Sequence, residues 1–200
     1  STRCDPSTIP PQAPLPPEIA IIYSRICYVI PRAEVLGPLI RFILRNQDGQ
    51  EYYIRSGLSW PLNSVLTIRG MAGIGKTTLA ATIANSTEIR QNFNRICFIN
   101  LGDHFIAKGG VNNVTYNIYL VCLRKLCEQI GAPADLFHDE VVYCPGENAL
   151  AKSSKAIQAI EKAKERMAEL MGGMRIFLIL DDVWCHEDVE LFNFREVGMR

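Results

Sequence analysis

The stretch LTIRGMAGIGKTTLA, residues 66–80, is an apolar run followed by three glycines, a lysine and two threonines. Gly70, Gly75, Lys76 and Thr77 fit the pattern GxxxxGK[ST] without a gap. Glycines allow a positive φ and let backbone N–H groups approach phosphate oxygens that a side chain would block. The stretch therefore predicts a phosphate-binding loop between a strand and a helix.

The residues after the glycines complete the predicted site. A helix that begins near Gly75 would add unsatisfied N–H groups and its positive dipole end. In this pattern Lys76 meets the β and γ phosphates, and the Thr77 hydroxyl meets Mg²⁺. The alternative is a glycine-rich turn that matches by chance, and the strand before and helix after favour the phosphate loop. The residues expected to bind the nucleotide here are Gly70, Met71, Ala72, Gly73, Ile74, Gly75, Lys76, Thr77 and Thr78.

Two aspartates provide a second candidate feature. Asp181 and Asp182 directly follow the apolar run IFLIL, residues 176–180. A carboxylate at a strand end beside a phosphate loop suits a magnesium ion. The alternative is a pair of solvated turn aspartates. The chain contains no Asn-Lys-x-Asp segment for reading guanine, and DDVW lacks the DxxG of guanine-specific proteins, so adenine is favoured.

Strands and helices alternate along the chain. Apolar, β-branched runs predict strands over residues 64–70, 95–101 and 174–184. Helical spacing predicts helices over 31–47, from about Gly75, over 113–131 and over 153–173, the last with a serine as N-cap. The expected apolar faces include Val35, Val121 and Ile157.

This alternation indicates an α/β fold, the three-layer α/β/α arrangement of P-loop NTPases with a mostly parallel sheet. We expect residues 1–18 to be a proline-rich linker with extended backbone and residues 19–200 to form the nucleotide-binding domain.

Composition restricts the partners and the compartment. Lys plus Arg and Asp plus Glu number 21 each, which gives no reason to expect nucleic acid. No apolar run approaches the length of a membrane span. The seven cysteines include no CxxC pair and the three histidines are scattered, so we expect a reduced, cytoplasmic chain without a structural zinc site.

GMAGIGKTTLA and FLILDDVW together resemble the two leading motifs of the NB-ARC domain, a family of signal-transducing ATPases that includes plant disease-resistance proteins and the apoptotic-protease activating factor. The segment YVIPRAEVLGPLIRFIL resembles the part that precedes the core of that domain. The resemblance implies that Lys76 and Thr77 hold phosphate and magnesium, that Asp181 holds magnesium and that Asp182 positions the hydrolytic water. It also implies that Ile30 and Arg32 contact the base and neighbouring phosphates, although VIPRAE departs from the family's glycine-arginine-glutamate order.

The family implies a switch that rests with ADP, becomes active with ATP and then self-associates. The chain ends before the strand that the family inserts beside the aspartate strand, so we expect a fold that is incomplete at the C-terminus and marginally stable alone. Two other readings stay open. One is a catalytic P-loop ATPase or small-molecule kinase, with Glu187 as the nearest candidate for a catalytic glutamate. The other is a fragment that serves only as an interaction surface.

Overall fold

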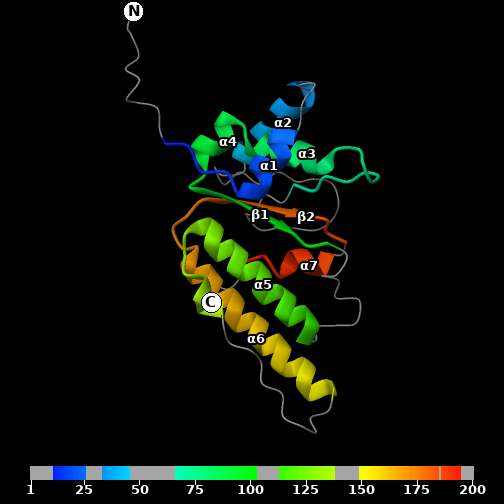
Figure 1. Ribbon diagram of the computed structural model, residues 1–200, viewed down its shortest axis with the longest axis vertical. Coiled ribbons are helices and arrows are strands. Elements are labelled where there is room, and N and C mark those ends of the chain that lie inside the picture. Colours follow the sequence, from blue (N-terminus) through cyan, green and yellow to red (C-terminus); the bar gives the residue numbers. More distant parts are fainter. Residues whose placement is uncertain are drawn as a thin grey trace, which may run out of the picture. The chain divides into compact units, whose positions relative to one another are not determined.

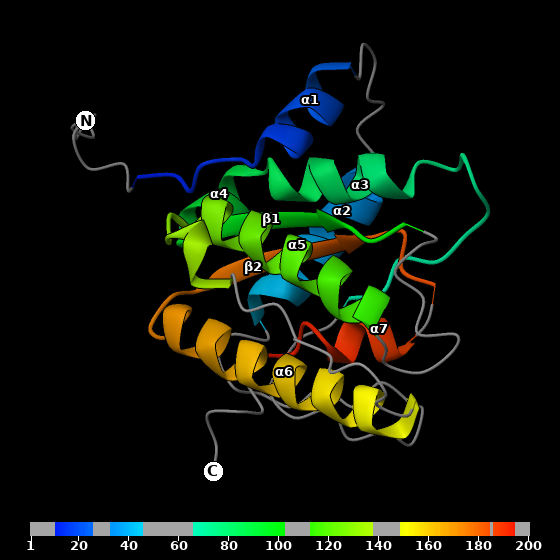
Figure 2. The ribbon, with the colours of Figure 1, turned by 60° about the horizontal axis from the view of Figure 1, so that its bottom comes forward.

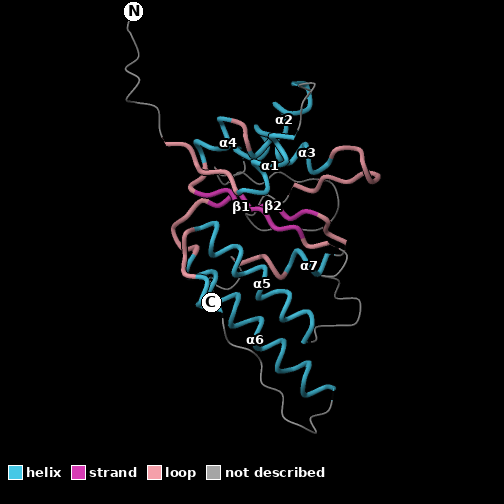
Figure 3. Tube along the Cα trace, viewed as in Figure 1, coloured by secondary structure: helices cyan, strands magenta, loops and turns pink. Residues whose placement is uncertain are grey.

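The computed structural model describes residues 11–25, 33–45, 66–102, 113–137, 149–184 and 186–194 (Figure 1). The chain divides into two compact units, Ser1–Asn94 and Arg95–Arg200. Figure 3 shows that the strands belong to the second unit, whereas the elements of the first are helices.

In the first unit, the helix after the glycine loop, α3 (Lys76–Ala84), is the common packing partner. It contacts α1 (Pro17–Arg25), α2 (Ala33–Arg45) and α4 (Thr87–Asn92), and α2 also contacts α4. The fully buried apolar side chains of this unit come from three of these helices. They are Ile19, Ala81, Ile83, Ala84 and Ile89.

In the second unit, β1 (Arg95–Asn100) and β2 (Ile176–Asp181) pair in parallel, with Arg95 opposite Ile176 and Asn100 opposite Asp181. The long helix α5 (Asn113–Ile130) packs on β1 and contacts α6 (Ala149–Leu170). Figure 2 shows α5 running beside the strands with α6 next to it.

Two short helices complete the second unit. The 3₁₀ turn η3 (Ala134–Phe137) packs on α5, and α7 (His186–Glu190) follows β2. The Tyr119 hydroxyl donates to the Leu191 carbonyl at 2.8 Å, and the Tyr119 ring meets Phe192 edge to face at 5.6 Å. The segment after α7 is thereby fixed to α5.

A glycine ends α5 as the sequence predicts. Gly131 has a φ of 79°, its N–H donates to Glu128, and the Ala132 N–H donates back to Cys127. This pair of bonds is the Schellman arrangement, which needs a left-handed residue just past the helix.

The small parallel sheet with flanking helices confirms the predicted α/β class and is consistent with an incomplete P-loop NTPase fold. One predicted strand is wrong. Residues 66–70 are described and form no strand, although Leu66 and Ile68 are half-buried and Thr67 is exposed, an alternation typical of extended backbone. A strand requires inter-strand hydrogen bonds, and the described sheet holds only β1 and β2.

Helix details also differ from the expectations. Helix α6 begins at Ala149, so Ser153 lies inside the helix and is not its N-cap. Ile157 and Val121 are each 48% exposed, and Val35 is 39% exposed, so these three apolar side chains do not belong to the core. Spacing alone places the centre of an apolar stripe, whereas its edges depend on which neighbouring element covers them.

Of the predicted linker, residues 11–18 are described, and part of this segment packs within the first unit. Helix α1 begins at Pro17, a position where a missing N–H costs nothing. Ala13, in the extended segment before it, is 4% exposed and exchanges hydrogen bonds with Arg90 of α4. Within the described ranges, the helices include none with the length and apolar character of a membrane span.

Candidate functional site

The glycine loop has the left-handed backbone that the sequence pattern requires. Gly73 has a φ of 77° and Gly75 a φ of 95°. Gly75 is also the N-cap residue of α3, and its carbonyl accepts the Leu79 N–H at 2.9 Å. The helix therefore begins directly after the loop, and the N–H groups of its first turn are directed toward the loop end.

Lys76 folds back over the loop that precedes it. Its Nζ donates to the carbonyls of Gly70 and Met71, both at 3.0 Å. An ammonium group has three donors, so these bonds use two and hold the positive charge against the loop. A phosphate oxygen that accepts a hydrogen bond from the third donor would lie beside the N-terminus of α3.

The tip of the loop is exposed and apolar. Met71 is 79% exposed and Ile74 is 67% exposed. A Cβ on Gly70 would approach Ile74 Cγ2 to 3.2 Å, so the two ends of the loop lie close together. The first residues of α3, 76–80, are half-buried, while Ala81, Ile83 and Ala84 anchor the rest of the helix in the core.

Thr77 and Thr78 occupy the first turn of α3 and are half-buried. The Thr78 carbonyl accepts the Thr82 hydroxyl at 2.8 Å. Thr77 is therefore the hydroxyl directly beside the lysine in the chain, the position that the pattern assigns to magnesium.

The two aspartates differ in backbone conformation. Asp181 is the last residue of β2, half-buried, and its carbonyl accepts the Leu101 N–H at 3.0 Å. Asp182 is exposed and has a φ of 53°, which is left-handed and, among the described non-glycine residues, found here alone. Left-handed backbone costs most residues about 1–2 kcal/mol, and aspartate tolerates it better than most. The two aspartates therefore differ in backbone conformation and in exposure.

One polar residue at the same strand end was missed. Asn100 closes β1, is exposed and lies opposite Asp181 in the parallel register. A polar residue that ends an apolar strand was the available signal, because ligands of parallel sheets bind beyond the carboxyl ends of the strands. Asn100 and Asp181 are therefore the sheet residues that a ligand at this edge would meet.

The predicted site residues are divided between the two compact units and the residues that the structure does not describe. The glycine loop, Lys76 and Thr77 belong to the first unit, and the aspartates belong to the second. Their action on one nucleotide stays a prediction. Ile30 and Arg32 lie outside the described residues. Glu187 is exposed on α7, five residues beyond Asp182.

Comparison with known proteins supports the resemblance. Residues 56–131 match the NB-ARC domain. The chain is 30% identical over 134 residues to disease resistance protein RGA2 of Solanum bulbocastanum, an alignment of 67% of this chain and 11% of that protein. It is 26% identical over 124 residues to disease resistance protein RPM1 of Arabidopsis thaliana, which covers 62% of this chain and 11% of that protein. The chain spans about a tenth of the length of these relatives. No match was found among solved structures.

Proposed function

Since the chain carries the NB-ARC signature over residues 56–131, we propose that it is the ADP- and ATP-binding part of a signal-transducing switch. The observation that carries this proposal is the geometry of Gly70 to Lys76. Two left-handed glycines, a helix N-terminus and a folded-back ammonium group form one short anion-binding element. Such an element suits a polyphosphate better than a single carboxylate, because it offers several donors in succession.

In the proposed complex, the loop N–H groups and Lys76 bind the phosphates. The Thr77 hydroxyl and the Asp181 carboxylate supply hard oxygen ligands of the kind that Mg²⁺ prefers. Asp182 positions the water for slow hydrolysis, and Arg32 contacts the nucleotide from the preceding segment. Nucleotide exchange would then control activation and self-association in a cytoplasmic defence-signalling protein, a role supported by the disease-resistance names of the relatives.

The first test is nucleotide binding by Lys76→Ala. Loss of a charge-assisted donor removes about 1.5–3 kcal/mol, so we expect affinity for a fluorescent ADP analogue to fall about 10- to 100-fold. Lys162→Ala removes an exposed lysine from α6 and should leave binding unchanged. Equal affinity of Lys76→Ala and the parent chain would refute the proposal.

Hydrolysis is tested separately from binding. Asp182→Asn keeps a side chain that tolerates left-handed backbone and removes the charge. We expect slow ATP turnover to fall while ADP binding is retained. Rapid, substrate-stimulated turnover that depends on Glu187 would instead favour a catalytic P-loop enzyme.

A further inference from the structure

Gln129, in the last turn of α5, makes an unusual contact with the sheet. Its side-chain carbonyl accepts the Phe98 N–H at 2.8 Å, and its side-chain amide donates to the Phe98 carbonyl at 3.0 Å. Both hydrogen-bonding groups of one β1 residue are therefore bound by one side chain. This is the pattern that a neighbouring strand would otherwise provide.

The pairing of β1 shows which edge Gln129 occupies. In an extended strand the N–H and C=O of one residue point to the same side, and those of the next residue point to the other. Arg95 and Leu101 donate to carbonyls of the β2 chain, at Arg175 and Asp181. Phe98 lies three residues from Arg95 and three from Leu101. Because three is an odd number, the N–H and C=O of Phe98 point to the opposite side, away from β2. Gln129 consequently lies on the outer edge of β1.

The position of Gln129 is fixed by bonds other than its own. Arg95 Nε donates to the Ile130 carbonyl at 3.3 Å, which ties the end of α5 to the start of β1. The left-handed Gly131, two residues after Gln129, lies just past the end of the helix. Gln129 is half-buried, and Phe98 is 4% exposed, so water has little access to the backbone groups that Gln129 binds.

An uncovered strand edge is a template for pairing with another chain. Phe98 is the third-from-last residue of an apolar, β-branched strand, RICFIN, whose composition favours such pairing. We propose that Gln129 closes the outer edge of β1 to strand addition by a second copy of this chain. The side-chain amide takes the place that a further strand would have beside Phe98, where the sheet of the described residues holds none.

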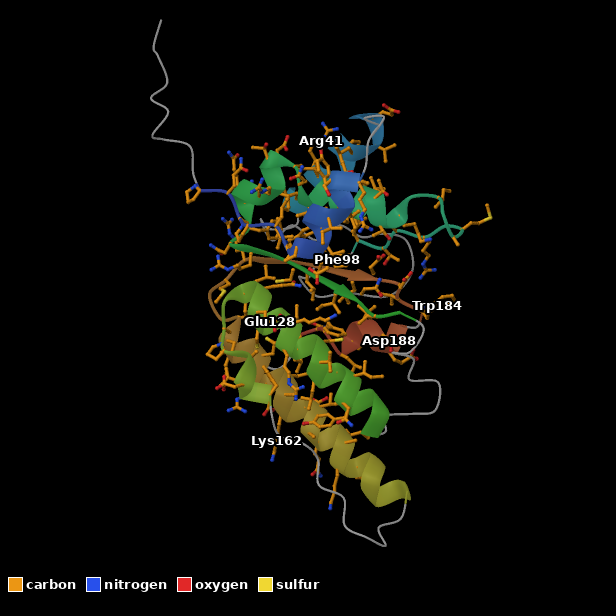
Figure 4. All side chains as sticks on the ribbon, in the orientation of Figure 1. Arg41, Phe98, Glu128, Lys162, Trp184 and Asp188 are labelled. Atoms are coloured by element: carbon orange, nitrogen blue, oxygen red, sulfur yellow. The ribbon has the colours of Figure 1, made fainter. Side chains whose placement is uncertain are left out.

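The test uses Gln129→Met, which keeps the length of the side chain and removes both hydrogen bonds. Amide hydrogen exchange of Phe98 should become about tenfold faster, because a bond to a part-buried amide is lost. The variant should also self-associate with rising concentration in analytical ultracentrifugation, whereas the parent chain should not do so through this edge. Figure 4 labels Phe98 and the control position Glu128.

Glu128→Met introduces the same apolar side chain one residue earlier, at an exposed position. It should change neither exchange at Phe98 nor association. If both variants associate equally, exposed methionine is the cause and the proposal fails. It also fails if Gln129→Met exchanges faster but does not associate, or if its exchange is unchanged.

A second variant guards against loss of folding. Gln129→Asn keeps the amide but is one methylene too short to span the Phe98 N–H and carbonyl, and it should show the same two effects. The parent chain alone also tests the proposal. If its Phe98 amide exchanges as fast as an unprotected amide, Gln129 does not protect this edge and the proposal fails.

Discussion

Gly75 has a φ of 95°, a left-handed value that glycine adopts without strain because it has no Cβ. A substitution by alanine places a Cβ in left-handed backbone, at a cost of about 1–2 kcal/mol. Because the same residue precedes the first turn of α3, the strain should disturb the N–H groups proposed to bind phosphate. We expect Gly75→Ala to weaken ADP binding about 5- to 30-fold.

A matched control exists in the same unit. Gly37 lies inside α2, where an added Cβ would meet nothing within 4 Å. Gly37→Ala should stabilise that helix by about 0.5–1 kcal/mol and leave nucleotide affinity unchanged. Isothermal titration of both variants separates the effect at the loop from a general effect of replacing glycine.

Three buried thiols provide a prediction on pH. Burial raises the pKa of Cys97 to about 12 and the pKa values of Cys122 and Cys127 to about 11, from an ordinary value of 9.0. The native state therefore holds these protons after the unfolded chain has lost them. Stability contributed by the neutral thiols is complete below pH 9 and decreases above it, by up to about 1.4 kcal/mol per pH unit for each thiol.

Urea unfolding at pH 7, 9 and 10.5 measures this effect. The free energy of unfolding should fall by only about 0.4 kcal/mol per thiol between the first two values, and it should fall more steeply between the second and the third. Cys97→Ala removes the thiol with the highest pKa, and its decline between pH 9 and 10.5 should be smaller. An identical decline in this variant would assign the pH effect to other groups.

At the scale of elements, the extended segment before α1 is held on α4. The Ala13 N–H donates to the Arg90 carbonyl at 2.7 Å, and Arg90 Nε donates to the Ala13 carbonyl at 3.0 Å. The prolines on both sides of Ala13 restrict the backbone already in the unfolded chain. Ordering this segment therefore costs little conformational entropy, and the two hydrogen bonds to Arg90 suffice to hold it. The second of these hydrogen bonds comes from the Arg90 side chain, whereas in a sheet it would come from the backbone of a neighbouring strand.

Arg90→Ala should release the segment. The Arg90 backbone carbonyl remains, but without the guanidinium bond we expect the Ala13 amide to exchange about 5- to 10-fold faster, the effect of losing about 1 kcal/mol. Glu88→Ala, at an exposed position of the same helix, is the control. Unchanged exchange at Ala13 in Arg90→Ala would show that the buried Ala13 side chain alone holds the segment.

At the scale of the whole chain, a bound nucleotide should act on stability by mass action. Mg²⁺ with ADP at about 100 times its dissociation constant stabilises the native state by about 2.7 kcal/mol. We expect a higher melting temperature for the parent chain, a smaller increase for Lys76→Ala, whose affinity is expected to be about 10- to 100-fold lower, and loss of only the magnesium-dependent part for Asp181→Asn. Stabilisation that is equal in all three chains would contradict the proposed ligand set.

The sequence by itself determined the elements whose signals are local. The glycine loop, the start of α3 after Gly75, the end of α5 at Gly131 and the two strands β1 and β2 depend on backbone preferences and apolar runs that neighbouring residues supply. The candidate phosphate residues follow from the same local pattern, because a loop of this kind is contiguous in the chain.

The tertiary structure decided everything that depends on a distant partner. Residues 66–70 have the composition of a strand yet form none, since composition cannot supply the hydrogen bonds of a second strand. Ile157 and Val121 have the spacing of core residues but stay 48% exposed, because no element of the described ranges covers them fully, whereas Ala13 is buried and its backbone bonds to α4. Gln129 carries no sequence signal at all: only the packing of α5 on β1 brings its amide to Phe98, 31 residues earlier.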